Sequence, residues 1–305
     1  MELLGGPGYV LLTTAHGRAP APQVVAAAGQ VIEIPAGRVD EIAGDLLGHV
    51  DGDRLVALGG GRVIDTAKAL ASAHGQTARA MAIPTTLSGA EMTTLHRRAR
   101  GAPAGGPGRR PAVVVNDPAL SASQPEAELA ASAANALGHA VEGPCTQNAN
   151  PVSTLAAHEG ARLLTSAFGS GKVDRLALAL GALLSGYVID STGYGLHHVA
   201  AQVLAREGGV PHAMANAALL PHTVVALARR FPARMAALDA ALGTPAVAVA
   251  GSLALRAGAT RLRDLGLSEE GIAHCAKVAA GRADLEHTPP RAGEPELREL
   301  YERAF

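Results

Sequence analysis

The sequence pattern of this 305-residue chain changes at Asn116-Asp117-Pro118. Before that point, short aliphatic runs alternate with amphipathic stretches, and the runs are GYVLLTT, QVIEIP, DRLVALGGG, ARAMAIPTT and RPAVVVND. Such alternation is typical of a parallel sheet with helices between its strands. From Pro125 onward, apolar residues recur at helical spacing and no segment has the pattern of a strand. We therefore predict an α/β domain over residues 1–117 and an all-helical domain over residues 118–305.

Local signals predict how several elements begin. The continuous apolar run in RPAVVVND is typical of a strand that is buried on both faces. Asn150-Pro151 should open one helix, and another should run from Lys172 to Ile189. Ser268 precedes an acidic first turn, so we expect its hydroxyl to cap the helix that follows.

Composition limits the partners of this chain. Hydrophobic residues make up 48% of it and aromatic residues 2%, so the core must be built largely from Ala, Val and Leu. The formal net charge is -1 and no long basic run occurs, which argues against a nucleic-acid partner. Cys145 and Cys275 belong to no CxxC pair, so we expect reduced thiols. Neither a basic leader nor an apolar run of roughly 18 residues occurs, and we expect no membrane association and a cytoplasmic location.

A run of three glycines lies between a predicted strand and a predicted helix. Gly59, Gly60 and Gly61 allow a sharp turn whose backbone N–H groups face outward at the start of the helix, a place that stabilises a phosphate anion. The run matches neither GxGxxG nor a Walker motif, and a simple tight turn is the alternative. Asp65 and Lys68 lie one helical turn apart and are consistent with a surface ion pair.

Hydroxyl side chains follow the next predicted strand directly. Thr85, Thr86 and Ser88 come after ARAMAIP, where the carboxyl edge of a parallel sheet usually meets a ligand. Their hydroxyls could donate to a phosphate or a carboxamide. An ordinary turn rich in Ser and Thr explains this segment equally well.

Three histidines and an asparagine recur at spacings that suit a metal site. Asn135 and His139 are four residues apart, as are His198 and Gln202, so each pair shares one face of a helix. Together with His212, these side chains could converge on a divalent ion such as zinc. Asparagine is a neutral, weaker ligand than a carboxylate, which favours a site without an obligatory metal. Histidines that serve the core or the helix surface are the alternative.

An ordered set of motifs resembles the iron-containing alcohol dehydrogenase family, and these motifs are GGGRVIDTAK, IPTTLSGAEMT, VNDPAL, NALGHAVE, GLHH and PHAMANAALLPH. Within that family they look most like the motifs of maleylacetate reductases. The resemblance covers nearly the whole chain. It implies a dehydroquinate-synthase-like fold, in which a dinucleotide-binding α/β domain and an all-helical domain flank a cleft, and it suggests a homodimer.

The resemblance also implies roles for individual residues. The glycine turn would hold the pyrophosphate of NAD or NADP, and the PTT segment would line the nicotinamide. The implied cofactor-binding residues are Gly59, Gly60, Gly61, Asp65, Lys68, Thr85, Thr86 and Ser88. The ligands of a bound metal, Fe or Zn, would correspond to Asn135, His139, His198 and His212. With asparagine at the first of these positions, the chain resembles maleylacetate reductases, which are thought to work without a metal.

Several features depart from the family pattern. Gln202 stands where the family usually has a histidine near the nicotinamide, so the customary proton relay is missing or displaced. The strand end TTAHG offers no Asp or Glu for the adenosine ribose, which leaves both NAD and NADP open. His96, Arg97 and Arg98 could meet a substrate carboxylate, and a solvated charge cluster is the alternative.

These observations predict an NAD(P)-dependent oxidoreductase acting on a small carbonyl, alcohol or enoyl substrate, with or without a carboxylate. The catalytic candidates are His198, His212, His139 and Gln202. Neutral imidazoles near their ordinary pKa would polarise the substrate oxygen or supply its proton. The alternative is a non-redox member of the fold, a lyase, a cyclase or a binding module, because Asn135 and Gln202 alter the usual constellation.

Overall fold

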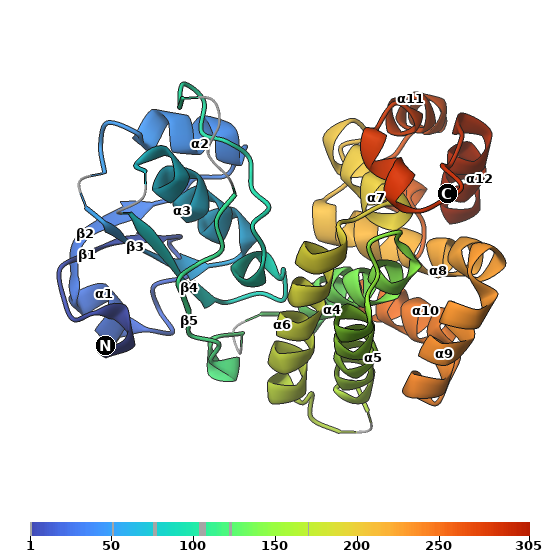
Figure 1. Cartoon of the computed structure of the whole chain (residues 1–305), viewed down its shortest axis with the longest axis horizontal. Helices are drawn as coiled ribbons and strands as arrows, with labels where there is room; N and C mark the ends of the chain where they lie inside the picture. The colour runs from blue at the N-terminus through green and yellow to red at the C-terminus, as the bar shows by residue number, and fades with distance from the viewer. Residues whose placement is uncertain (1, 51, 76–77, 104–107, 122–123, 170) are drawn as a thin grey trace. The chain divides into compact units, whose positions relative to one another are not determined.

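The computed structural model describes residues 2–50, 52–75, 78–103, 108–121, 124–169 and 171–305. The chain divides into two compact units, Met1–Ser123 and Gln124–Phe305. We call them the N-terminal unit and the C-terminal unit and describe each by itself (Figure 1).

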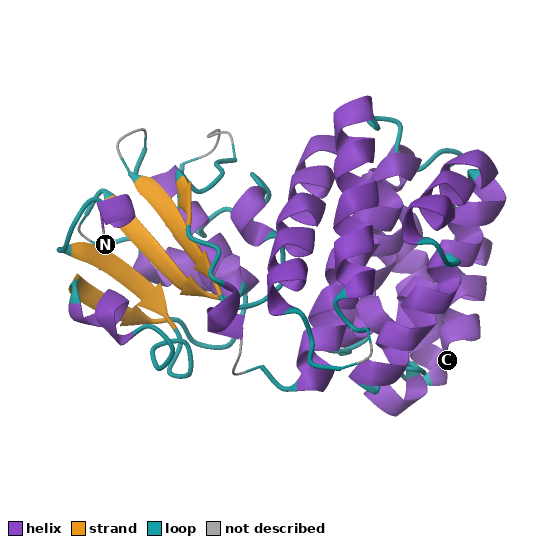
Figure 2. Cartoon of the chain, turned by 90° about the horizontal axis from the view of Figure 1, so that it is seen from below, coloured by secondary structure: helices purple, strands orange, loops and turns teal. Residues whose placement is uncertain are grey.

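The N-terminal unit is built on a parallel sheet whose strand order is β2-β1-β3-β4-β5 (Figure 2). The strands are β1 (Tyr9–Thr13), β2 (Ala28–Glu33), β3 (Arg54–Gly59), β4 (Arg79–Pro84) and β5 (Val113–Val114). The chain passes from β1 outward to β2 and then returns to the other side of β1 with β3, so the topology switches between β1 and β3. Ligands of open α/β sheets bind at such a switch point, beyond the carboxyl ends of the strands.

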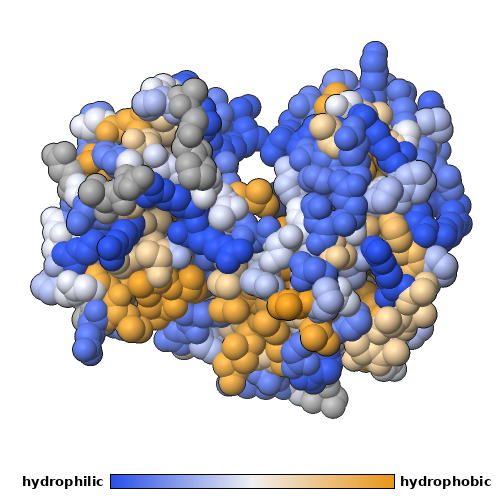
Figure 3. Space-filling view, in the orientation of Figure 1, coloured by the Kyte–Doolittle hydropathy of each residue, from blue (hydrophilic) through white to orange (hydrophobic). Residues whose placement is uncertain are grey.

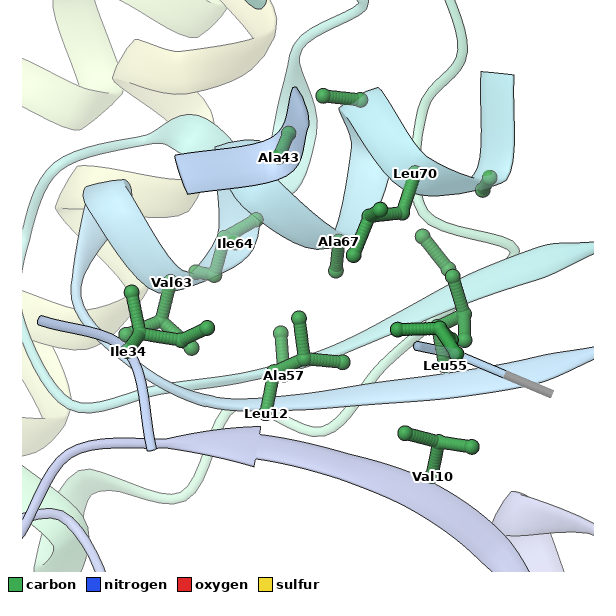
Figure 4. Close-up of a cluster of buried hydrophobic side chains, with 14 of the residues drawn as sticks. Val10, Leu12, Ile34, Ala43, Leu55, Ala57, Val63, Ile64, Ala67 and Leu70 are labelled. Carbon is green, nitrogen blue, oxygen red and sulfur yellow. The ribbon is translucent and has the colours of Figure 1, made fainter. Parts of the chain in front are cut away.

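Helices cover both faces of this sheet. They are α1 (Pro22–Ala26), α2 (Val39–Leu46) and α3 (Gly61–Ala73), with short 3-10 turns η1 (Glu2–Leu4), η2 (Ala90–Met92) and η3 (Pro118–Ser121). Side chains alternate along β1, so Val10 and Leu12 belong to the apolar core under α3 while Leu11 belongs to the core on the opposite face. In the first core, Ile64 and Leu70 of α3 lie over the sheet (Figure 4). Each such buried aliphatic side chain stabilises the fold by about 1.5–3 kcal/mol.

The prediction for the last strand was wrong in length and burial. β5 contains Val113 and Val114 alone, and both are half-buried rather than buried on two faces. It lies at the edge of the sheet and pairs with Met81 and Ala82 of β4. An aliphatic run does not distinguish a central strand from an edge strand, because that difference depends on which strands pair beside it.

The described part of the C-terminal unit is helical, as predicted. Its helices are α4 (Glu126–Glu142), α5 (Pro151–Ser166), α6 (Arg175–Thr192), α7 (Leu196–Arg206), α8 (His212–Arg230), α9 (Pro232–Leu242), α10 (Ala246–Ala257), α11 (Glu269–Ala280) and α12 (Glu294–Ala304). Short 3-10 turns are η4 (Gly143–Cys145), η5 (Arg263–Leu265) and η6 (Ala283–His287). Together with the parallel sheet of the N-terminal unit, this confirms the predicted fold class.

Several predicted helix starts are confirmed. Asn150 accepts from the Ser153 backbone, and the Ser153 hydroxyl accepts from the Asn150 backbone in return, which makes a capping box. Ser268 caps α11 by accepting from the Gly271 backbone. The helix expected from Lys172 begins at Arg175 instead, because the Asp174 carboxylate caps it there.

Small residues allow α5 and α6 to approach closely. A Cβ atom added to Gly181 would lie 3.0 Å from the Gly160 carbonyl oxygen, and one added to Gly160 would lie 3.2 Å from the Gly181 carbonyl oxygen. On the outer side of α6, Leu176 and Leu180 are exposed, and Figure 3 shows apolar surface over the lower part of this helix.

Within the described residues, no single helix is long and apolar enough to cross a membrane. Two bent helix pairs meet the criteria of length and composition together, α6 with α7 at 101° and α9 with α10 at 65°.

Candidate active site

The glycine run forms the connection between β3 and α3. β3 ends at Gly59, Gly60 precedes the helix, and α3 begins at Gly61. The Gly60 carbonyl already accepts from the backbone N–H groups of Val63 and Ile64, at 3.0 and 3.2 Å. Gly60 has no side chain to cap the first turn, so the N–H groups at this helix start receive no side-chain acceptor from this position.

The hydroxyl segment after β4 packs directly against this turn. The Thr85 backbone N–H donates to the Gly59 carbonyl at 3.1 Å. A Cβ atom at Gly60 would lie 3.0 Å from Thr86 Cγ2, and one at Gly61 would lie 3.1 Å from the Ser88 side chain. The two segments identified separately in the sequence therefore form one half-buried cradle without side chains on its glycine side. This cradle suits the pyrophosphate of a dinucleotide.

Asp65 and Lys68 lie on the next turn of α3 and form an ion pair of 2.7 Å. Lys68 is fully buried, so the prediction of a surface pair was wrong in its burial. The Lys68 ammonium donates to the carbonyls of Ala90 and Leu95 at 2.9 and 2.7 Å. Lys68 thus fastens the segment after the PTT motif onto α3. A direct contact of Asp65 or Lys68 with a dinucleotide stays a prediction.

Glu91 is a buried carboxyl group that the sequence analysis missed. It lies in η2, is 2% exposed, and follows Gly89, whose φ of 73° favours glycine. Burial raises the pKa of Glu91 to about 7, although Lys68 lowers it. Among the described residues, its Oε2 atom has no hydrogen-bond partner. An acid inside SGAEMT, a segment of small and apolar residues, was the available signal.

Two of the three basic residues after η2 interact with other residues of the N-terminal unit. His96 lies 3.1 Å from the Ser72 hydroxyl and 3.0 Å from the Arg97 carbonyl. Arg97 forms an ion pair of 3.4 Å with Asp40. Arg98 is exposed. A substrate contact for these three residues stays a prediction.

In the C-terminal unit, the predicted histidines come from three helices. Asn135 and His139 lie on α4, His198 and Gln202 on α7, and His212 at the start of α8. The His139 and His198 rings stack, with centroids 4.5 Å apart and planes at 30°. The structure therefore brings the α4 and α7 histidines into contact.

A glycine makes this contact sterically feasible. A Cβ atom at Gly138 would lie 2.7 Å from His197 Nε2 and 3.3 Å from His198 Cε1, so any larger residue would push the imidazoles away from α4. His197, which the sequence analysis did not single out, packs edge to face against His198 at 4.8 Å. Its Nδ1 atom lies 2.9 Å from the Thr223 hydroxyl. At His212, the Asn216 amide donates to the ring Nε2 at 3.3 Å.

Glu142 joins α4 to the start of α7. It is fully buried, its Oε1 accepts from the His197 backbone N–H at 2.6 Å, and its Oε2 lies 2.9 Å from His198 Nδ1. Burial raises the pKa of Glu142, and His197 together with backbone N–H groups lowers it. Asn135, His139 and Glu142 follow one another at steps of four and three residues on one face of α4, and this spacing could have identified Glu142 from the sequence.

Burial keeps the clustered imidazoles neutral. It lowers the pKa of His197 and His198 to about 3, and it lowers the pKa of His139 well below the ordinary range, with neighbouring histidines adding to the effect. The prediction of histidines near their ordinary pKa was therefore wrong. Sequence spacing shows that the rings share a face, and the pKa depends on how completely the surrounding helices exclude water.

Several buried polar atoms in this cluster lack an acceptor or a donor. Among the described residues, Asn135 Oδ1, His139 Nδ1, His198 Nε2 and Gln202 Oε1 have no hydrogen-bond partner. A buried polar group without a partner costs about 1–3 kcal/mol, so such a concentration is typical of a ligand site rather than of a packed core.

The same side chains do not form a metal-binding group in their present arrangement. In the described ranges, no three or more His, Cys, Asp or Glu side chains are placed to hold a metal ion. The His139 and His198 rings contact each other directly, with their centroids 4.5 Å apart.

Comparison with known proteins decides the family. A sequence profile described as "Fe-containing alcohol dehydrogenase family, C-terminal" matches residues 129–305. The chain belongs to the iron-containing alcohol dehydrogenase family. The predicted resemblance is thereby confirmed.

Relatives with two different activities match this chain. Maleylacetate reductase 2 of Cupriavidus pinatubonensis is 36% identical over 201 residues, 63% of this chain and 55% of that protein. The 1,3-propanediol dehydrogenase of Klebsiella pneumoniae is 32% identical over 216 residues, 64% of this chain and 55% of that protein. The matched part of the chain spans little more than half the length of these relatives.

Solved structures of the family share the fold. Maleylacetate reductase from Agrobacterium tumefaciens superposes with a TM-score of 0.86 at 28% identity, covering 100% of this chain and 91% of that chain. Sulfoacetaldehyde reductase from Bifidobacterium kashiwanohense, solved in complex with NAD+, has a TM-score of 0.82 at 21% identity and covers 99% of this chain and 92% of that chain. At the latter identity the likeness concerns the fold alone.

Proposed function

We propose that this chain is a nicotinamide-dependent oxidoreductase that transfers a hydride between NAD(P) and a small carbonyl, alcohol or enoyl substrate, in the manner of maleylacetate reductases. Membership of the iron-containing alcohol dehydrogenase family supports this proposal. The observation that carries it is the cradle of Gly60 and Gly61 against Thr86 and Ser88, beyond the carboxyl ends of β3 and β4.

The N-terminal unit would bind and orient the dinucleotide. The pyrophosphate would accept from the backbone N–H groups at the start of α3, and the hydroxyls of Thr86 and Ser88 would donate to it or to the carboxamide. Lys68 would hold the PTT segment in place through its bonds to Ala90 and Leu95. When bound, the nicotinamide supplies or accepts the hydride.

The C-terminal unit would handle the substrate oxygen. Neutral imidazoles at His139 and His198 present unpartnered ring nitrogens that can accept from a hydroxyl or donate to a carbonyl oxygen, according to tautomer. Because burial opposes an imidazolium, these rings act as hydrogen-bonding groups that pass a proton on rather than as a stored charge. Gln202 would add an amide where the family pattern has a histidine.

Binding of NADH and NADPH to the purified full chain tests the proposal directly. We expect micromolar or tighter affinity for at least one of them by calorimetry, and nicotinamide oxidation when maleylacetate or a related small carbonyl compound is added. No detectable affinity for either dinucleotide would overturn the redox proposal. Size measurement by light scattering in the same preparation tests the proposed homodimer.

A second candidate function is a non-redox lyase, cyclase or binding module. Two residues favour it, Asn135 in place of a carboxylate and Gln202 in place of a histidine. Fold membership does not exclude this reading, since one fold supports many chemistries. Product formation from a substrate screen without any change in nicotinamide absorbance would support it over hydride transfer.

A further inference from the structure

Helix α7 begins without a capping side chain of its own. Its first residue follows Gly195, and the backbone N–H groups of its first turn are satisfied by side chains from elsewhere. The Thr288 hydroxyl accepts from Leu196 at 3.2 Å, and Glu142 of α4 accepts from His197 at 2.6 Å. Glu142 therefore serves as a cap supplied by another helix. Burial raises the pKa of Glu142, while the backbone N–H groups at the positive end of the α7 dipole oppose that rise and stabilise the carboxylate.

The second oxygen of this carboxylate decides how His198 is protonated. A carboxylate can accept hydrogen bonds but cannot donate them, so His198 Nδ1 must carry the proton that it shares with Glu142 Oε2 at 2.9 Å. A neutral imidazole carries one proton, and Nε2 therefore keeps its lone pair. That Nε2 atom is buried and has no hydrogen-bond partner among the residues that the structure covers.

We infer that Glu142 is a positioning residue that fixes His198 in the Nδ1–H tautomer and thereby presents the Nε2 lone pair to a substrate hydroxyl. Carboxylates behind a functional histidine commonly fix its tautomer and ring orientation in this way. The inference rests on the proposed function for what the lone pair acts on, and it concerns the alcohol and carbonyl substrates of that proposal. During oxidation the hydroxyl proton passes to Nε2 as the Nδ1 proton moves to Glu142 Oε2, so the imidazole stays neutral, while the hydride leaves the same carbon for the nicotinamide; each transfer reverses during reduction.

His197 supplies the internal comparison. Its Nδ1 lies 2.9 Å from the Thr223 hydroxyl, which can donate its own proton to the Leu220 carbonyl at 3.0 Å. Its Nε2 faces Gly138, where an added Cβ atom would lie 2.7 Å away. His197 therefore packs against the backbone of α4, and its tautomer is set by Thr223 instead of by Glu142.

The decisive variant is Glu142→Gln. Backbone N–H groups can only donate, so the new amide must direct its oxygen to His197 N and its NH2 group to His198 Nδ1. An NH2 group facing Nδ1 requires a lone pair there, and the proton of His198 must then move to Nε2. The substitution preserves the cap and the side-chain size but inverts the tautomer.

The test is nitrogen NMR of the full chain with 15N-labelled histidine, with the His198 signals assigned from a His198→Asn sample. We expect a protonated Nδ1 and a bare Nε2 in the unsubstituted protein and the reverse in Glu142→Gln. Glu142→Asp should keep the original tautomer, and Thr223→Val should leave His198 unchanged while altering His197. A protonated Nε2 in the unsubstituted protein, or an unaltered His198 in Glu142→Gln, would overturn the inference.

Kinetics provide the second measurement. Glu142→Gln should lower kcat for alcohol oxidation by roughly 10- to 100-fold, the usual effect of removing a carboxylate behind a functional histidine, while the KM for the dinucleotide stays the same. A purely structural cap would instead lower the thermal midpoint and leave kcat per folded molecule unchanged, which would count against the inference. If Glu142→Gln does not fold, the His198 nitrogen signals of the unsubstituted protein and of Glu142→Asp still test the inferred tautomer. Failure of the proposed function would appear separately, as absent dinucleotide binding with the predicted tautomer intact.

Discussion

The glycine cradle of the N-terminal unit and the histidine cluster of the C-terminal unit are built in opposite ways. The cradle works through backbone groups, and its glycine side is defined by missing side chains at Gly60 and Gly61. The histidine cluster works through buried side chains whose protonation depends on neighbours from three helices, such as Glu142 behind His198. A backbone site depends on local conformation, whereas a side-chain cluster depends on tertiary packing. The two should therefore respond differently to substitution.

The largest expected effect is in the histidine cluster. His198→Ala removes the Nε2 atom that would act on the substrate oxygen, and we expect a loss of roughly 1,000-fold in kcat, within the usual range for an acid–base group. Dinucleotide affinity should change less than about threefold, because the cradle lies in the other unit. Steady-state kinetics and calorimetry measure the two quantities. His274→Ala, at an exposed histidine paired with Glu207, is the control. An equal loss of kcat in His274→Ala would show that the effect is not specific to the histidine cluster.

The opposite pattern is expected at the cradle. Gly61→Val places a Cβ atom 3.1 Å from the Ser88 side chain and would obstruct the proposed pyrophosphate site. We expect roughly 100-fold weaker dinucleotide binding, about 3 kcal/mol, measured by calorimetry. Gly251→Val is the matched control, since a Cβ atom there meets nothing within 4 Å. Unaltered affinity in Gly61→Val would show that the dinucleotide does not use this turn.

These two regions also show what the sequence could and could not predict. The fold class, the glycine turn and the Asn150 and Ser268 caps were predictable because each depends on residues close in the chain. The pairing of His139 with His198 could be expected only in outline, since it also requires Gly138 to admit the rings. The lowered histidine pKa values and the Glu142 contact were not predicted, because burial and an acceptor from another helix exist only after the helices pack.

Glu91 is an exception to this difference between the two units, because it is a side chain in the N-terminal unit whose pKa depends on burial. Its pKa is raised from 4.5 to about 7 by burial, so the folded state holds a proton that the unfolded state releases. The stabilising contribution is therefore complete below about pH 4.5 and is lost as pH rises through 7, which corresponds to about 3 kcal/mol. We expect the free energy of unfolding of Glu91→Gln, measured by denaturant titration, to vary less with pH over this interval. An identical slope in both proteins would contradict the burial of an ionisable Glu91.

The smallest effect is expected for a substitution that restores a carboxylate to the cluster. Asn135→Asp supplies the charged ligand type that the family's metal-dependent members are expected to have, and a preformed metal site would then bind zinc or iron more tightly. Among the described residues, no three or more His, Cys, Asp or Glu side chains are placed to hold a metal ion. We therefore expect zinc affinity, measured by competition with a chelating dye, to change less than about threefold, well under 1 kcal/mol. A tenfold or larger rise in zinc affinity would mean that the imidazoles reorient around an ion. The cluster would then be a metal site in which Asn135 replaces one ligand, rather than a set of neutral hydrogen-bonding groups.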